Sequence, residues 1–210
     1  MTNPIMPMIV AAVTLITPGA SAGPCAGQPS ISVEVNVQEA PITIVQDIPL
    51  ESMRAVSAQL PQQPAHPVLG FYAGTIGYVL RAYEISSDSS ACPGFSLKAD
   101  LVAVDRRIAV ASDLVGSHCR FKAALDHYQH HAAAASLALH RFASELPAKL
   151  SPEIEEYIQA RQLTSDEARH YADTLLDTAV GNLSASLPQV QKNVDTKDEI
   201  QRLSAPCDGI

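Results

Sequence analysis

Hydrophobic and polar residues alternate strictly over residues 31–37, with isoleucine or valine at each odd position and serine, glutamate or asparagine at each even one. A period of two is typical of a β-strand with one buried face. Apolar residues within 42–45 predict a second short strand, and residues 70–85 predict one long or bent strand. Gly74 and Gly77 are candidate bulge or bend positions there, because glycine inside a strand often marks such a site.

The next apolar segments, 97–104 and 107–112, predict a β-hairpin that turns at Asp105-Arg106. From residue 118 onward the apolar period changes to that of helices. Strands that precede helices along the chain are typical of an α+β fold. We therefore expect a small antiparallel sheet packed against a long histidine-bearing helix and one or two further C-terminal helices.

Start and stop signals divide the helical region. The long helix is expected over residues 118–146, because Pro147 should end it. Ser151-Pro152-Glu153 has the capping serine, the proline at the first position and the early acid of a new helix. Thr164-Ser165-Asp166-Glu167 is a capping box for a last helix that should end near residue 183.

The composition suits one globular domain with a sizeable core, since 47% of the 210 residues are hydrophobic and 17% are charged. The formal net charge is -8 and the isoelectric point is near 5.2. A negative surface disfavours phosphates and anionic lipid, and the few aromatic residues offer no platform for stacked bases. We expect no nucleic-acid partner.

The first 22 residues carry no charged side chain and contain an apolar run, 5–16, followed by Ala20-Ser21-Ala22. This pattern predicts a signal peptide at 1–22 and a mature single domain at 23–210, which is periplasmic or secreted. The alternative is a short membrane anchor, but about a dozen apolar residues are too few to span a bilayer comfortably. After cleavage we expect no membrane association.

All four cysteines, Cys25, Cys92, Cys119 and Cys207, lie in the mature part, and an even number in an exported chain favours disulfides. Three pairings are possible. The expected hairpin register places Cys92 opposite Cys119, which leaves Cys25 for Cys207. The polar tail from residue 193 would then be attached only through Cys207. A cysteine metal site is the alternative, and no C-x-x-C spacing supports it.

The main chemical signal is His127-Tyr128-Gln129-His130-His131, inside the long helix. Residues four apart lie on one face of a helix, so His127 and His131 can direct two ring nitrogens at one Zn²⁺ ion. A projection at about 100° per residue puts both histidines on the apolar face. Hydrolytic sites of this type have glutamate at the second position as the base. Here that catalytic position holds Tyr128, which is not a ready base at neutral pH.

A third metal ligand would have to come from another element. Asp166, His170 and Asp173 lie along one flank of the last predicted helix, so each is a candidate if that flank meets His127 and His131. The alternative is that this flank is an acidic surface facing solvent.

The segment from Cys119 to His131 resembles certain bacterial secreted domains of unknown function, in which a cysteine precedes a helix that carries His-Glu-x-x-His. Those domains are regarded as zinc-dependent proteases, and the similarity extends to the strand 107–112 and the closing segment 194–207. The resemblance implies a zincin-like fold and a zinc ion held by His127 and His131. The chain departs from the pattern at Tyr128, on the catalytic residue itself.

Three functions are consistent with these observations. The first is an exported zincin-like domain that binds zinc, has lost efficient hydrolysis and acts as a binding module. The second possibility is an active zinc metallopeptidase whose base comes from elsewhere, and the third is a metal-free structural or protein-interaction domain. In zincin-like folds an edge strand beside the metal helix can bind an extended peptide. Residues 70–85 and 97–104 are the candidate edge strands.

Overall fold

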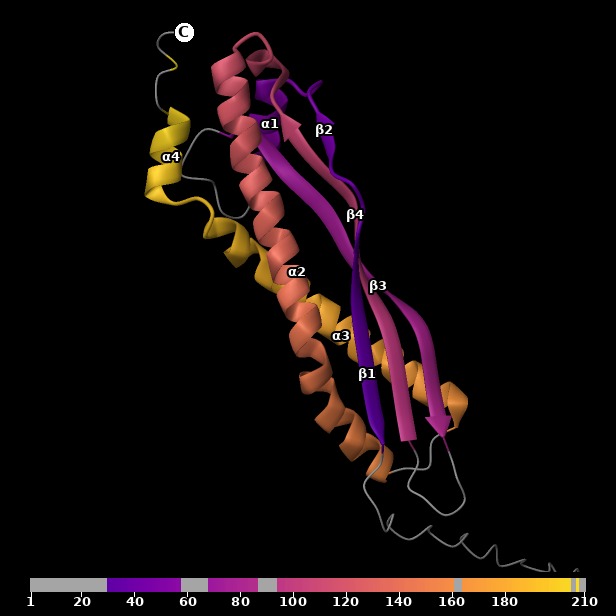
Figure 1. Cartoon of the computed structure of the whole chain (residues 1–210). Helices are drawn as coiled ribbons and strands as arrows, with labels where there is room; N and C mark the ends of the chain where they lie inside the picture. The colour runs from indigo at the N-terminus through magenta and orange to yellow at the C-terminus, as the bar shows by residue number, and fades with distance from the viewer. Residues whose placement is uncertain (1–29, 58–67, 87–93, 161–163, 205–206, 208–210) are drawn as a thin grey trace, which may run out of the picture.

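The computed structural model describes residues 30–57, 68–86, 94–160, 164–204 and 207 (Figure 1). The expected signal peptide, Cys25 and Cys92 lie outside these residues. The α+β class is confirmed, since the long helices follow the last strand and only the short α1 lies between strands. The elements are β1 (Ile31–Glu39), β2 (Thr43–Val45), α1 (Leu50–Ser57), β3 (Gly70–Ser86), β4 (Gly94–Val110), the 3-10 turn η1 (Ser112–Leu114), α2 (His118–Ala160), α3 (Ser165–Lys192) and α4 (Lys197–Ser204).

The sheet is mixed, so the expectation of an antiparallel sheet was wrong. β4 is the central strand: β3 pairs with it in antiparallel orientation, whereas β1 and β2 pair with it in parallel orientation. β1 pairs with residues 95–103 of β4, and β2 pairs with residues 107–109 of the same strand. These two strands therefore follow one another along one edge of β4, and β3 pairs with its other edge. Among the described strands β3 has only one neighbour, which makes it an edge strand and excludes β4 from that role.

The hairpin expected at Asp105-Arg106 does not form, because β4 continues through this pair to Val110. Asp105 has a φ angle of 52°, a left-handed conformation that aspartate tolerates better than most residues. The register between β3 and β4 shifts opposite this pair, at Gly74, while Gly77 lies in regular pairing. The polar pair is therefore part of a bulge within one long strand, which a sequence pattern alone does not distinguish from a turn.

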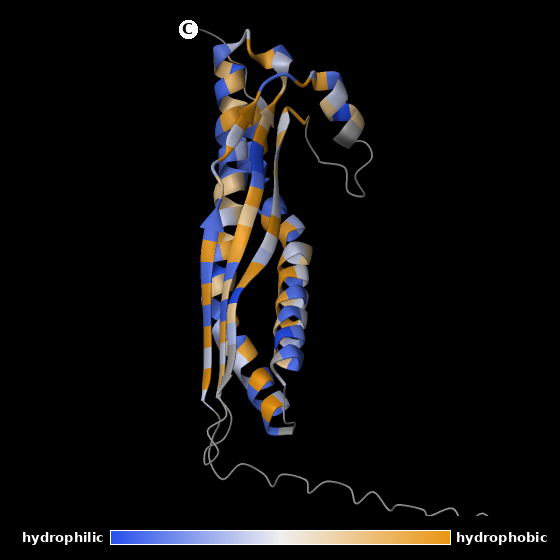
Figure 2. Cartoon of the chain, turned by 90° about the vertical axis from the view of Figure 1, so that its right-hand side faces the viewer, coloured by the Kyte–Doolittle hydropathy of each residue, from blue (hydrophilic) through white to orange (hydrophobic). Residues whose placement is uncertain are grey.

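The burial of the strands follows their position in the sheet. Along β1, half-buried and exposed residues alternate as the sequence predicted, and Figure 2 shows the corresponding alternation of hydrophobic and polar residues. β4 is buried at most positions, because it has a strand on each side. Its fully buried side chains include Phe95, Leu97, Leu101 and Ile108, which form the centre of the core.

Helix α2 runs through Pro147 and Pro152 to Ala160, so the break expected at Pro147 was wrong. A proline inside a helix costs about 3 kcal/mol. The apolar residues that follow offset this cost, because each buried side chain contributes about 1.5–3 kcal/mol. They pack against β4 and α3 and comprise Leu150, Ile154 and Ile158. The hydroxyl of Ser151, expected to cap a new helix, instead donates to the carbonyl of Pro147 at 2.7 Å.

Helix α3 begins as predicted, with Thr164 and Glu167 forming both bonds of a capping box. It continues past the end expected near residue 183 to Lys192, and the polar tail then forms the additional helix α4. α2 packs along the sheet, while α3 crosses behind it and packs on β3 and α2 (Figure 1). α4 lies beside the first turns of α2, at one end of the molecule. None of the helices in the described part of the chain is long and apolar enough to cross a membrane.

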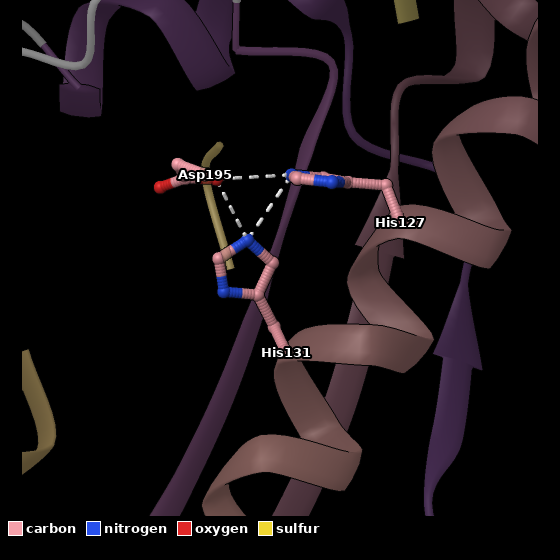
Figure 3. Close-up of side chains that lie close together, drawn as sticks. All are labelled: His127, His131 and Asp195. Atoms are coloured by element: carbon pink, nitrogen blue, oxygen red, sulfur yellow. Dashed lines mark hydrogen bonds and ion pairs between the residues drawn. The ribbon is translucent and has the colours of Figure 1, made fainter. Parts of the chain in front are cut away.

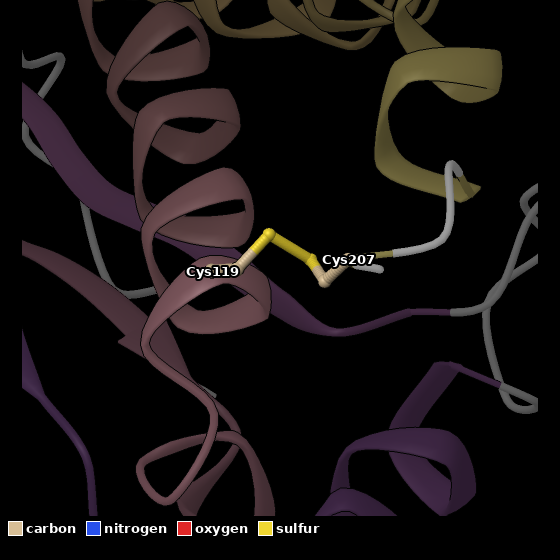
Figure 4. The surroundings of a disulfide bond; sticks show 2 residues. All are labelled: Cys119 and Cys207. Carbon is tan, nitrogen blue, oxygen red and sulfur yellow. A yellow bond between two sulfur atoms is a disulfide. The ribbon is translucent and has the colours of Figure 1, made fainter. Parts of the chain in front are cut away.

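A disulfide joins Cys119, in the first turn of α2, to Cys207, beyond the end of α4 (Figure 4). The expected pairs Cys92–Cys119 and Cys25–Cys207 were therefore wrong. Both rested on the hairpin register, which does not exist. The 17 residues of β4 form one strand whose ends are separated by roughly 50 Å at the usual rise per residue.

Candidate metal centre

His127 and His131 lie on the buried face of α2, as the helical projection predicted. His127 is 0% exposed and His131 is 8% exposed. Their neighbours along this face are buried alanines, which leave room for other segments to approach the imidazole rings. These alanines are Ala124, Ala132 and Ala135.

The segment between α3 and α4 brings Asp195 to the two histidines (Figure 3). The Oδ1 atom of Asp195 lies 3.1 Å from Nε2 of His131 and 3.3 Å from Nε2 of His127. The two Nε2 atoms lie 3.1 Å apart. We refer to these three residues as the His-His-Asp cluster. The side chain of Asp195 is 28% exposed, so the cluster borders solvent on that side.

Each histidine uses its other ring nitrogen, Nδ1, to contact a different residue. Nδ1 of His127 lies 3.1 Å from Oε1 of Glu199, on α4. Nδ1 of His131 lies 2.5 Å from Oε1 of Gln191, in the last turn of α3. The amide nitrogen of Gln191 donates to the backbone carbonyl of His131, which orients the amide oxygen toward the ring. Both partner atoms are oxygens that accept hydrogen bonds. We therefore place the proton of each neutral imidazole on Nδ1, where it can be donated to them.

This assignment leaves a lone pair on Nε2 of each histidine. Two lone pairs and a carboxylate oxygen of Asp195 then converge on one point with no donor among them. Three acceptors in this arrangement repel one another unless a cation, either a proton or a metal ion, lies between them. Histidines that bind metal ions in proteins usually donate their second ring N–H to a carboxylate or carbonyl group. Both histidines of the cluster have such a partner.

The separations also match the geometry of a metal site. With metal–ligand distances of about 2.0–2.1 Å and tetrahedral angles, neighbouring ligand atoms lie roughly 3.3–3.4 Å apart. The three ligand atoms of the cluster are separated by 3.1, 3.1 and 3.3 Å. Their separations are therefore close to those along one face of a coordination tetrahedron. The donor set of two imidazoles and one carboxylate fits a metal ion and leaves the fourth position open to another ligand.

Tyr128, at the position where the expected zincin-like pattern would have a glutamate, packs its side chain against the start of β3. It is 6% exposed, and its ring lies over Gly70. Burial raises the pKa of Tyr128 to about 12, and hydrogen bonds from the backbone of Gly70 and Leu69 lower it only in part. Its hydroxyl is therefore protonated at neutral pH and is engaged by the β3 backbone.

Glu199 is the second carboxylate beside the cluster, and Arg202 holds it in place. Two guanidinium nitrogens of Arg202 donate to its two oxygens at 2.7 and 2.8 Å. These bonds bring the pKa of Glu199 to about 2, with a smaller contribution from His127, while burial opposes the shift. Glu199 is therefore ionised, and its role in this geometry is to orient the imidazole of His127.

The structure brings Asp195 to the two histidines, and not the expected third ligands. Asp166 and His170 are exposed in the first turns of α3, and Asp173 lies 3.9 Å from Arg169 on the same helix. All three lie on the helix that the sequence predicts to end near residue 183. The longer α3 carries the chain past that point, and the third candidate ligand, Asp195, comes from the connection that follows it.

A capping pattern in the sequence would have indicated this connection. Thr196 and Glu199 have the Thr-x-x-Glu spacing of a capping box. In the structure the backbone N–H of Glu199 donates to the hydroxyl of Thr196 at 3.2 Å, at the start of α4. The residue before the cap is Asp195. Gln191 carries no comparable signal, because a glutamine near the end of a helix is ordinarily exposed.

Compared with models of known protein families, with curated proteins and with solved structures, the chain gives no significant match. The geometry of the His-His-Asp cluster is therefore the main indication of function.

Proposed function

We propose that this chain is an exported zinc-binding domain of zincin-like type that has lost efficient peptide hydrolysis and acts as a binding module. The observation that carries the proposal is the convergence of two Nε2 atoms and one carboxylate oxygen at 3.1–3.3 Å, from His127, His131 and Asp195. Zinc is favoured because imidazole nitrogens and one carboxylate at these separations match its usual ligands and tetrahedral geometry. The partners on both Nδ1 atoms support a site that is organised before the ion binds.

The surroundings of the cluster favour binding over hydrolysis. A zinc peptidase needs a general base within hydrogen-bond reach of the attacking water. Tyr128, at the usual position of that base, is engaged by the backbone of β3. Glu199 is occupied by Arg202 and His127. An active metallopeptidase would require a base from another residue.

The disulfide supports export. Bridges such as Cys119–Cys207 form and persist in oxidising compartments and are rare in the cytosol. This agrees with the apolar leader and the Ala-x-Ala pattern at the N-terminus. The periplasm or the extracellular space is therefore the proposed location.

The test of the metal site is the zinc content of the mature chain, purified without a polyhistidine tag and dialysed against trace zinc. We expect about one zinc per chain, and much less in the His127→Gln/His131→Gln variant. The matched control is His170→Gln, which removes an exposed histidine on α3 and should retain the metal. No zinc in the wild type, or equal zinc in the double variant, would refute the proposal.

An assay with casein as an unstructured substrate separates a binding module from a peptidase. We expect no cleavage by the zinc-loaded protein. Cleavage that a chelator abolishes and added zinc restores, and that the His127→Gln/His131→Gln variant lacks, would favour the active metallopeptidase instead.

The proposed partner is an extended peptide or protein segment that pairs with the edge of β3 that has no neighbour among the described strands. Backbone groups on the unpaired edge of a strand can hydrogen-bond an added strand. A cavity of about 310 Å³ lies beside this strand, with mostly apolar walls that include Ile76, Leu139 and Leu187. The cavity also reaches Gln191, the residue that orients His131. An apolar side chain of the bound segment would occupy it.

Peptide binding can be tested with a random display library selected on the zinc-loaded protein. We expect enriched sequences with alternating apolar residues, whose binding is lost in the Ile76→Asp variant because a carboxylate would enter the apolar cavity. Val79→Asp is the control, since Val79 is an exposed residue of the same strand. No enrichment, or equal binding by Ile76→Asp, would contradict this partner.

A further inference from the structure

Helix α4 supplies Glu199 to the metal centre, yet it has little packing of its own. None of its residues is buried. Its polar contacts with α2 include the Glu199–His127 bond, a contact of 3.6 Å between Oε1 of Glu199 and Nδ1 of His130, and a bond of 3.3 Å from Arg202 to the carbonyl of Ala123. A helix of eight residues is too short to be stable alone in water, so its position depends on attachments at its ends.

The Cys119–Cys207 bridge provides one of these attachments. It fixes the chain just beyond α4 to the first turn of α2 (Figure 4). The other attachment is the end of α3, at Lys192. Asp195 and Glu199 both lie between these two points, so the bridge converts a tail with one fixed end into a segment fixed at both ends.

We propose that the Cys119–Cys207 disulfide controls the metal affinity of the His-His-Asp cluster by holding α4 against α2. This inference rests on the proposed zinc-binding function. When the bridge is absent, α4 is released, Glu199 leaves Nδ1 of His127, and the carboxylate of Asp195 is no longer held near the two Nε2 atoms. The metal must then organise its own ligands, which weakens binding.

The bridge forms when the two cysteine thiols lose two protons and two electrons. The acceptor is a disulfide oxidant, which is reduced to two thiols. Such oxidants act in the compartments to which exported proteins are delivered. The cluster thereby gains its full affinity for metal only after the chain has reached an oxidising environment.

The experiment compares the wild type with the Cys119→Ser/Cys207→Ser variant. Serine is preferable to a reductant, because free thiolates bind zinc themselves. The dissociation constant for zinc is measured by competition with a chromophoric chelator, and circular dichroism verifies that the variant is folded. We expect affinity about 10–100-fold weaker in the variant, as is usual when an outer partner of a metal-bound histidine is lost.

A second substitution separates control through α4 from general stabilisation. Glu199→Gln is combined with the serine pair and measured alone. If the bridge acts by placing Glu199, the serine pair will weaken zinc binding less in the Glu199→Gln background than in the wild type. Additive effects would show that the bridge does not act through Glu199 and would overturn this mechanism.

A third variant covers the case in which the serine pair does not fold. A flexible linker of about six glycine and serine residues is inserted after Ser204, so that the bridge remains but no longer restrains α4. We expect weaker zinc binding here as well. Unchanged affinity in a folded serine variant or in the linker variant would overturn the inference while leaving the zinc site intact. Absence of zinc from the oxidised wild type would overturn both proposals.

Discussion

The ring of Tyr128 covers Gly70, the first residue of β3. A Cβ atom at position 70 would lie 2.6 Å from Cε2 of Tyr128 and 2.2 Å from the carbonyl oxygen of Ala109. Tyr128 thus anchors α2 to the sheet. This contact gives Tyr128 a structural role next to the two histidines of the His-His-Asp cluster.

Replacing Tyr128 with phenylalanine tests this structural role. Loss of the hydroxyl leaves backbone groups at the start of β3 without their partner, which should lower the free energy of unfolding by about 1–3 kcal/mol. Zinc content should not change, because the hydroxyl is not one of the ligand atoms. Denaturant unfolding and metal analysis measure the two effects. Loss of zinc with unchanged stability would instead place Tyr128 in the metal centre.

Replacing Gly70 with alanine should destabilise the protein by more than about 2 kcal/mol, since the added methyl group meets backbone that cannot move freely. Gly116→Ala is the matched control, because an added Cβ there meets nothing within 4 Å. We expect the control to change the free energy of unfolding by no more than about 0.5 kcal/mol. Similar effects in both variants would show that Gly70 is not the close contact described above.

Gln191 should be required for full zinc affinity. Its side chain fixes both the tautomer and the orientation of His131. Gln191→Leu keeps much of the volume but removes both bonds, so we expect the dissociation constant for zinc to rise about 10–100-fold. Gln189→Leu, on the exposed side of the same helix, should leave it unchanged. Competition titration measures both constants, and an unaffected Gln191→Leu variant would contradict this role.

Glu145 should contribute a pH-dependent stabilisation of α2. Hydrogen bonds from Arg141 and Lys149 lower the pKa of Glu145 from 4.5 to about 2. A carboxyl group whose pKa is lowered by folding stabilises the protein above its ordinary pKa, and this effect is lost as the pH falls toward 2. The wild type should therefore have a higher Tm than Glu145→Gln at pH 7.

The difference in Tm between these two proteins should shrink steadily between about pH 4.5 and pH 2. It should also shrink in high salt, because all three side chains are at least 41% exposed and their charges are screened. Thermal scans at several pH values and two salt concentrations provide the measurement. A difference that is constant over this range would mean that the pairs contribute nothing through charge.

The sequence by itself determined the local features of this protein. Alternation of apolar and polar residues defined β1, and the capping box defined the start of α3, because both depend on neighbours along the chain. Helical periodicity likewise placed His127 and His131 on one buried face, since residues four apart on a helix share a face in any tertiary setting.

Tertiary packing decided the rest. A long β4 replaced the hairpin because β3 pairs along it through a bulge, and α2 passed Pro147 because burial of the following apolar residues outweighs the cost of the proline. The continuous β4 and the uninterrupted α2 also determined which cysteines pair and which carboxylate lies beside the two histidines. Cys207 and Asp195 reach α2 only because α3, which packs on β3 and α2, returns the chain toward the first turns of α2 (Figure 1). No spacing along the chain encodes this long-range arrangement.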